Sequence, residues 1–257
     1  MTGGLALDDA AWGSAWRGRA VRDKAVLAFG LLVLVLVLPP WPGAALVAVA
    51  TIVVLLGPAR VAPGLLLRCL AAPMAFVVVG AASVLVSIAW EGGPVLRITA
   101  ESVAAAATLL VRGLAGTTAL LVLATTTPMV DLVAAMRRAR IPDACVEVAS
   151  LVYRLLFVLL ESVRAITEAQ AARLGYGTRR ATLRSSAALT GAVLLRSWER
   201  ARRLEEGLAG RGYTTSLRTL DPPRTASGRF VAAAVALLAA IAAASVLVGA
   251  LTGTVAR

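Results

Sequence analysis

Ala171-Ala172-Arg173-Leu174-Gly175-Tyr176 ends one charged helical pattern, and Leu208-Ala209-Gly210-Arg211-Gly212-Tyr213 ends a second. A helix that ends near glycine leaves its last carbonyl groups unpaired, and glycine adopts the left-handed cap without strain. An arginine in that last turn is favoured by the helix dipole and projects beyond the helix end, where it can bind a partner's carboxylate. Ordinary capping explains one such ending equally well. Two of them, each with tyrosine after glycine, indicate a pair of arginine tips, Arg173 and Arg211, that bind another protein.

The composition around these segments is that of a polytopic membrane protein. Hydrophobic residues make up 59% of the chain, the mean hydropathy is +0.84, and the apolar residues form long blocks. The net charge is +12, and the positive residues flank or separate the apolar blocks, as the positive-inside rule expects of cytoplasmic loops. A nucleic-acid-binding role is disfavoured, because no binding motif is visible and aromatic residues are few.

The sequence contains no histidine and only two cysteines, Cys69 and Cys145. The missing imidazole excludes histidine acid–base catalysis, a Ser-His-Asp triad and histidine metal ligation. The cysteines lie far apart, without the spacing of a zinc site or a disulfide framework. We therefore expect no catalytic residues, no resident metal and no cofactor. If the protein moves a metal, a different subunit is expected to bind it.

The apolar blocks predict an all-α fold with about five transmembrane helices and two long cytoplasmic helices. The first two blocks are short for a hydrocarbon core of about 30 Å, which needs about 20 residues, so a hairpin that borrows flanking residues stays an alternative for them. The basic residues before the first block place the N-terminus in the cytoplasm of a multi-pass protein of the cell membrane. The predicted spans cover residues 25–38, 44–57, 69–90, 102–125 and 230–251.

Three regions follow from this pattern: an N-terminal membrane bundle of about four spans (1–127), a cytoplasmic region with the two long helices (128–228) and a C-terminal transmembrane helix (229–257). The middle region is set apart by its charge, since residues 128–229 contain 17 arginines and 9 acidic residues. Within it, residues 146–160 are almost wholly apolar except for Arg154. We interpret them as a helix at the membrane surface with Arg154 reaching to water, and a further span is the alternative.

Arg112 lies deep within the fourth predicted span. A charge at that depth costs at least about 2.5–3.5 kcal/mol unless it faces protein or water. Two interpretations stay open for this intramembrane charge. Arg112 either belongs to a packing or partner-facing surface, or it pairs locally with a threonine, a carbonyl or a carboxylate such as Glu101.

The two long helices each carry an apolar stripe. The first is predicted from Pro142-Asp143 to Arg173 and the second from about Thr182 to Gly210, which makes the second on the order of 40 Å long. The opposite face of the second helix is charged, with Glu199–Arg203 and Arg202–Glu206 at the i,i+4 spacing. The stripe residues proposed for partner contact are Val152, Leu156, Leu159 and Val163 on the first helix and Leu194 and Trp198 on the second.

These segments resemble the T component, the transmembrane coupling subunit of energy-coupling-factor importers, in its cobalt-transport permease Q branch. The resemblance rests on residues 126–213; the spans match only in character. The matching segments are Thr126-Thr127-Pro128, Asp131-Leu132, Met136-Arg137-Arg138, Ile141-Pro142, the run from Leu151 to Glu161, the run from Ala169 to Tyr176, the run from Leu195 to Ala201, and Arg211-Gly212-Tyr213.

The resemblance implies that a separate ABC-type ATPase dimer receives the two tips. By that resemblance Ala172, Arg173, Leu174 and Gly175 form the first coupling motif, and Gly210, Arg211 and Gly212 form the second. Gly210 replaces the usual alanine, and Gly207-Leu208 replaces the usual Ala-Met, departures that bear on coupling strength. ATP would close the dimer and draw the tips together. The helices would pass this motion to a substrate-binding membrane subunit, the S component, on their apolar face.

The resemblance favours cobalt as the substrate, with nickel, biotin or another vitamin as alternatives. Homodimeric and heterodimeric ATPases fit the sequence alike, and so do dedicated and shared S components. The chain has no Walker-type glycine-rich loop, so it is not expected to bind ATP by that motif or to be an enzyme.

Two other functional classes are weighed against this one. One is an intramembrane enzyme that uses Arg112 and Glu101 on phosphorylated lipids, but the spans lack a paired-carboxylate or nucleophile–base arrangement. The other is a membrane anchor whose basic helices bind anionic lipid.

Overall fold

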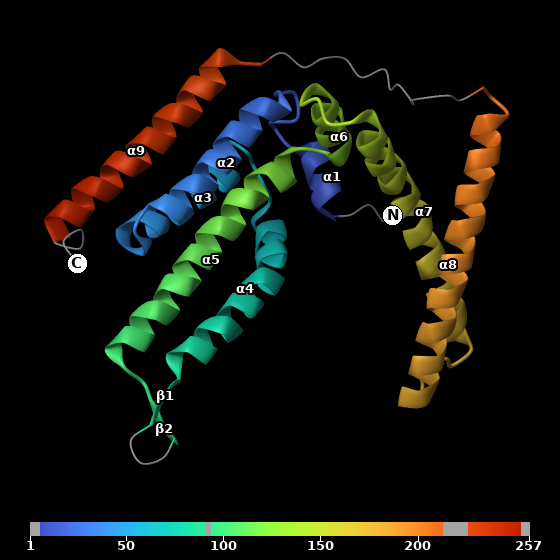
Figure 1. The fold of residues 1–257 in the computed structure, drawn as a ribbon, viewed down its shortest axis with the longest axis horizontal. Helices are drawn as coiled ribbons and strands as arrows, with labels where there is room; N and C mark the ends of the chain where they lie inside the picture. The colour runs from blue at the N-terminus through green and yellow to red at the C-terminus, as the bar shows by residue number, and fades with distance from the viewer. Residues whose placement is uncertain (1–5, 91–93, 213–225, 253–257) are drawn as a thin grey trace. The chain divides into compact units, whose positions relative to one another are not determined.

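The computed structural model describes residues 6–90, 94–212 and 226–252. The described chain forms two compact units, which we treat separately. Residues 6–131 and 226–252 form the bundle unit, and residues 132–212 form the hairpin unit. The elements in chain order are α1 (Ala6–Gly13), α2 (Val21–Val37), η1 (Pro40–Ala44), α3 (Ala45–Leu56), α4 (Pro63–Leu85), β1 (Ser87–Trp90), β2 (Pro94–Arg97), α5 (Ala100–Thr126), α6 (Met129–Arg138), α7 (Asp143–Ala172), α8 (Arg179–Ala209) and α9 (Gly228–Thr252) (Figure 1).

The fold is that of an all-α polytopic membrane protein, as predicted. Within the described residues, α4, α5 and α9 are long and apolar enough to cross a membrane. The two short predicted spans correspond to α2, which has 17 residues, and to the apolar segment Pro40–Leu56 that contains α3. At 1.5 Å per residue α2 is about 26 Å long, a little short of the hydrocarbon core.

Three local predictions differ from the structure. The third span was expected over 69–90, but α4 begins at Pro63, where proline suits the first helical turn, and ends at Leu85. The expected end of that span is instead the strand β1, which pairs antiparallel with β2. Helix α1 was not predicted, because its polar sequence gives no apolar periodicity long enough to indicate a helix.

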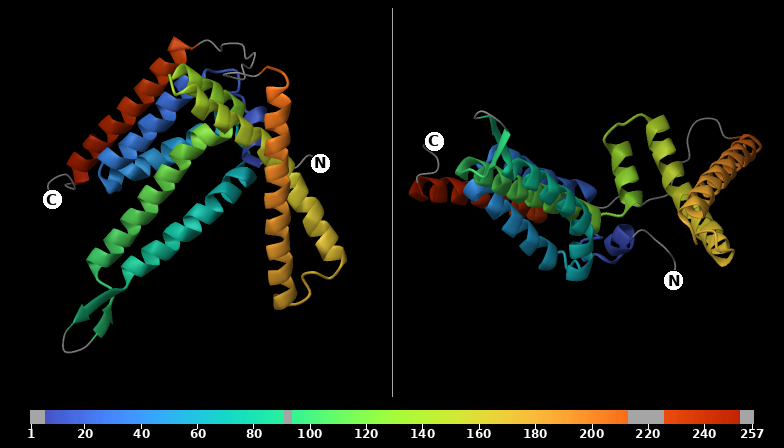
Figure 2. Two further views of the ribbon diagram at one scale, coloured as in Figure 1. Left: turned by 45° about the vertical axis from the view of Figure 1, so that its right-hand side comes forward. Right: turned by 90° about the horizontal axis from the view of Figure 1, so that it is seen from below.

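Helix α5 is the centre of the bundle unit. It packs against α1, α2, α3 and α4, and Figures 1 and 2 show α4 and α5 running together to the β1–β2 hairpin. Ala115 and Ala119 are fully buried on α5, and such small side chains let neighbouring helices approach closely. Leu31, Val47 and Val122 fill the core around them.

A buried charged junction joins the ends of α2, α5 and α9. Asp23 and Lys24 are both 0% exposed. The Lys24 ammonium donates a 2.6 Å hydrogen bond to the carbonyl of Thr126, and the Ser227 backbone N–H donates a 2.8 Å hydrogen bond to Oδ2 of Asp23. Oδ1 of Asp23 is buried and has no hydrogen-bond partner among the described residues. The charged junction therefore ties three helices that lie far apart in the sequence.

The hairpin unit is built on α7 and α8, which pack against each other as an antiparallel pair (Figure 2). Their apolar residues recur at threes and fours, and this spacing gives each helix one apolar face. Pro142 precedes α7. Thr178 caps α8, because its side chain accepts a 3.2 Å hydrogen bond from the Ala181 N–H. The sequence left open whether residues 146–160 lie at the membrane surface or cross the membrane. They lie within α7, which is not among the helices apolar enough to span a membrane.

Candidate functional site: two arginine tips and an apolar helix face

The first arginine tip lies in a turn held by side-chain hydrogen bonds. The Tyr176 hydroxyl donates to Oε1 of Gln170 at 2.7 Å, and the Gln170 amide donates to the Ser185 carbonyl at 3.0 Å. The Ser185 hydroxyl in turn donates to the Gly175 carbonyl at 2.8 Å. A Cβ at Gly175 would lie 2.7 Å from the Ser185 hydroxyl oxygen, so the turn needs glycine there. These contacts fix the geometry at the end of α7.

The left-handed residue of this turn is Leu174, not the expected Gly175. Leu174 has a φ of +55° and its side chain is 82% exposed. A left-handed conformation costs a residue with a Cβ about 1–2 kcal/mol. The cap falls one residue earlier than predicted because the Gly175 N–H bonds back to the Gln170 carbonyl at 2.9 Å. The turn thus presents an apolar side chain beside Arg173.

The second tip follows the end of α8 and is simpler. Gly210 is right-handed, with a φ of −64°, and the left-handed residue is Gly212, with a φ of +70°. The left-handed cap lies at the second of the two glycines, because the Gly210 N–H still bonds to the Glu206 carbonyl as in a helix. Arg211 therefore projects from the turn between these two glycines.

Both tip arginines are exposed, and neither side chain has a hydrogen bond or ion pair within the described ranges. They lie at opposite ends of α8, since Arg173 is in the α7–α8 turn and Arg211 is beyond the far end (Figure 1). The 31 residues of α8 separate these ends by about 45 Å. The hairpin unit thus offers two widely spaced cations to solvent. Tyr213, the tyrosine expected after the second tip, lies outside the described residues.

The predicted apolar stripe is only partly covered by the hairpin itself. Val152, Leu194 and Trp198 are exposed, with Trp198 at 71%, whereas Leu156, Leu159 and Val163 are half-buried. A hollow of about 340 Å³ is lined by Trp198 and its α8 neighbours. Exposed large apolar side chains gathered on one surface typically mark a contact with a protein or a membrane.

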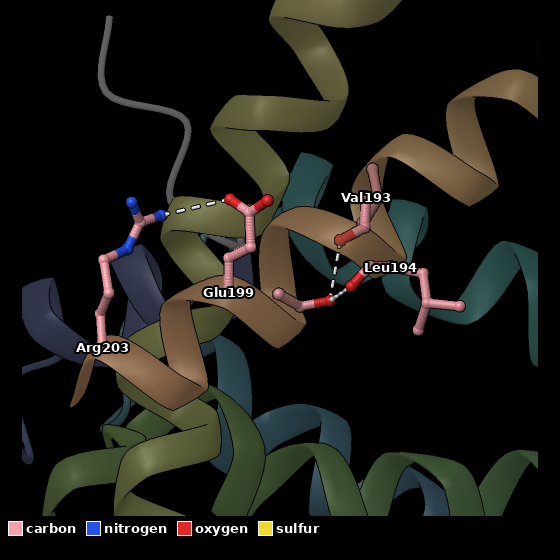
Figure 3. A network of polar contacts seen from close by, with 5 residues as sticks. Val193, Leu194, Glu199 and Arg203 are labelled. Carbon is pink, nitrogen blue, oxygen red and sulfur yellow. Dashed lines mark hydrogen bonds and ion pairs between the residues drawn. The ribbon is translucent and has the colours of Figure 1, made fainter. Parts of the chain in front are cut away.

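The charged face of α8 forms both predicted ion pairs. Arg202 Nε lies 3.1 Å from Glu206, and Arg203 Nη2 lies 3.5 Å from Glu199. Figure 3 shows the second pair together with Val193 and Leu194. The carbonyls of Val193 and Leu194 accept hydrogen bonds from the Ser197 hydroxyl. Exposed pairs of this kind contribute little stability, about 0.3–0.5 kcal/mol each. The two pairs neutralise four charged side chains of α8 within the helix itself.

A second hollow, of about 360 Å³, was not predicted from the sequence. Arg154 of α7 lines it together with Arg200 and Arg203 of α8 and three leucines. These arginines are brought together only by the pairing of α7 with α8. Neither helix carries a local signal for this cluster.

Arg112 is exposed and makes a hydrogen bond to the end of another helix. Its Nη2 donates a 3.4 Å hydrogen bond to the carbonyl of Leu38, the residue that follows α2. Glu101 is not its partner, because 11 residues of α5 separate them by about 16 Å along the helix. The short α2 leaves its last carbonyls unpaired inside the bundle, and Arg112 satisfies one of them. Among the described residues, no group of three or more histidine, cysteine or acidic side chains is placed to hold a metal ion.

Comparison with known proteins identifies the family of this chain. The family model of the cobalt transport protein CbiQ matches residues 13–220. The cobalt transport protein CbiQ of Rhodobacter capsulatus is 40% identical over 90% of this chain and 94% of its own length. The protein of the same name from Salmonella typhimurium is 32% identical over 76% of this chain and 90% of its own.

A Methanocorpusculum labreanum chain, whose name describes a fused cobalt transport protein CbiMQ, is 33% identical over 60% of this chain and 27% of its own length. On the family match and the two nearly full-length relatives, this chain belongs to the CbiQ cobalt transport protein family, a membrane transport component and not an enzyme.

Proposed function

We propose that this chain is the transmembrane coupling subunit of an energy-coupling-factor importer whose substrate is cobalt. In this proposal a separate ABC-type ATPase dimer binds the two arginine tips, one on each subunit. The observation that carries the proposal is the pair of exposed arginines, without partners among the described residues, at opposite ends of the long helix α8. Two sites about 45 Å apart suit two separate grooves on a dimer.

The turn geometry supports a role in force transmission. Motion at a tip reaches a distant surface only through elements that do not deform, and the first tip is held by the Tyr176–Gln170–Ser185 hydrogen bonds. The first coupling motif, Ala172 to Gly175, and the second, Gly210 to Gly212, are then the contact residues. An arginine on a partner's carboxylate forms a charge-assisted, two-pronged contact that lysine does not reproduce.

The apolar face of α7 and α8 is proposed to hold the substrate-binding membrane subunit. Its residues are Val152, Leu156, Leu159, Val163, Leu194 and Trp198, of which the most exposed is Trp198. Tryptophan is over-represented among the residues that dominate interfaces. The name of the fused relative, which joins M and Q parts in one chain, supports a membrane partner of this kind. We assign cobalt recognition to that partner, because this chain has no histidine.

The proposal includes the membrane topology. We place the N-terminus, residues 128–228 and both arginine tips in the cytoplasm, where an ATPase would meet them. The 17 arginines between residues 128 and 229 fit this side of the membrane.

Charge reversal at both tips tests the proposal. Arg173→Glu with Arg211→Glu is expected to abolish co-purification of the ATPase, because each tip would then repel an acidic groove. The matched control, Arg164→Glu with Arg196→Glu, changes the net charge equally at exposed positions within α7 and α8. Both variants should insert in the membrane at normal yield. An undiminished ATPase yield from the tip variant would refute the coupling role.

A further inference from the structure

The bundle unit contains a groove that the coupling function does not use. Trp16 and Arg19, from the segment between α1 and α2, line it together with Leu27 of α2. The remaining lining includes Val54 near the end of α3 and Phe230 and Leu237 of α9. The groove has a volume of about 240 Å³. We call it the interfacial groove, and we propose that it binds an anionic phospholipid, with the phosphate on Arg19 and an acyl chain along α9.

The mouth of the groove is an ordered aromatic and cationic site. The Trp16 and Phe230 rings meet edge to face, with centroids 5.1 Å apart, and Trp16 is 5% exposed. The Arg19 guanidinium carbon lies 4.5 Å from the Phe230 ring centroid. Stacking on a ring face leaves the N–H groups at the guanidinium edge available. Within the described residues, the Arg19 side chain makes no hydrogen bond or ion pair, so these donors can bind a phosphate.

The position of the groove matches the structure of a phospholipid. Arg19 precedes the first turn of α2, and Phe230 lies in the first turn of α9, so both sit where apolar helices begin. Arginine and tryptophan at this level are typical of the headgroup region. Below them the lining is apolar. Arg22 and Arg229, exposed in the same first turns, add positive charge, as do the N-terminal ends of both helices.

A phospholipid fits this groove better than a protein segment or a free anion. A stable protein contact buries about 800 Å² on each partner, which needs a broader surface than a 240 Å³ hollow offers. Inorganic phosphate would leave the apolar part unfilled. Basic pockets between membrane helices are established positions for anionic headgroups, and each nearby arginine contributes about 1 kcal/mol to such binding.

The test uses the full-length chain, purified in detergent and examined by native mass spectrometry and thermal unfolding. Phosphatidylglycerol is expected to remain bound and to raise the unfolding temperature. Phosphatidylcholine with the same acyl chains, and inorganic phosphate, are expected to do neither. Arg19→Gln should weaken phosphatidylglycerol binding about fivefold or more. The control Arg196→Gln, which removes an equal charge from the hairpin unit, should leave binding unchanged.

A second variant tests the apolar part of the groove without altering charge. Ala233 lines the interfacial groove and is exposed. Ala233→Phe should therefore fill the apolar part of the groove, where the acyl chain would lie, without disturbing the fold. It is expected to abolish the preference for phosphatidylglycerol. The proposal would be overturned if phosphatidylglycerol and phosphatidylcholine bound equally well, or if Arg19→Gln and Ala233→Phe both bound phosphatidylglycerol as the unmodified chain does. It would also be overturned if inorganic phosphate alone stabilised the protein. Cross-linking of Ala233→Cys to a partner protein in native membranes, in place of lipid, would also overturn it.

Discussion

Replacement of Lys24 by methionine removes the only positive charge buried in the bundle core among the described residues. The methionine side chain keeps most of the apolar stem of lysine, so packing changes little. The variant loses the 2.6 Å hydrogen bond to the Thr126 carbonyl, and it leaves the buried Asp23 carboxylate in place. It therefore perturbs the charged junction and no exposed surface.

The expected cost follows from these contacts. A hydrogen bond from a charged donor contributes about 1.5–3 kcal/mol, and a buried acceptor left without its donor costs about 1–3 kcal/mol. Relief of the desolvation of Lys24 offsets part of this loss. We expect a net destabilisation of about 2–4 kcal/mol, which for a chain of this size lowers the unfolding temperature by about 4–16 °C.

The assay is thermal unfolding of the purified chain in detergent. The variant Arg68→Met is the control, because Arg68 is exposed on α4 of the same unit and its loss should change stability by no more than about 0.5 kcal/mol. Adding Asp23→Asn to Lys24→Met should restore part of the loss, since asparagine removes the buried charge and still accepts from the Ser227 N–H. An unfolding temperature of Lys24→Met equal to that of Arg68→Met would refute the role given to the charged junction.

Two further predictions concern the hairpin unit. Leu174→Gly should raise the stability of the α7–α8 turn by about 1 kcal/mol, because glycine adopts a φ of +55° without strain. The same variant should weaken ATPase co-purification if the Leu174 side chain contacts the ATPase. A loss of stability on thermal unfolding would contradict the strain argument. Trp198→Ala should lose the co-purifying membrane subunit and keep the ATPase, whereas Leu183→Ala, equally exposed on α8, should keep both. Retention of the membrane subunit by Trp198→Ala would move the contact to another surface.

The sequence was sufficient to predict the long helices α5, α7, α8 and α9. Long apolar blocks and threes-and-fours spacing depend on local composition, so α5, α7, α8 and α9 occur within three residues of their predicted bounds. The charged junction was not predictable, because Lys24 reads as one of several cations before an apolar run. Its burial depends on Thr126, 102 residues away. The cap at Leu174 was missed for a similar reason, since the Gln170 and Ser185 contacts hold Gly175 in place.

Purification of the tagged chain from its native membrane, under gentle solubilisation, tests the central claim most directly. We predict that an ABC-type ATPase and a second, small membrane protein co-purify with it, and that cobalt binds to the second protein. Recovery of the chain alone, in detergents that keep such complexes intact, would contradict the coupling role and would leave the arginine tips as helix caps.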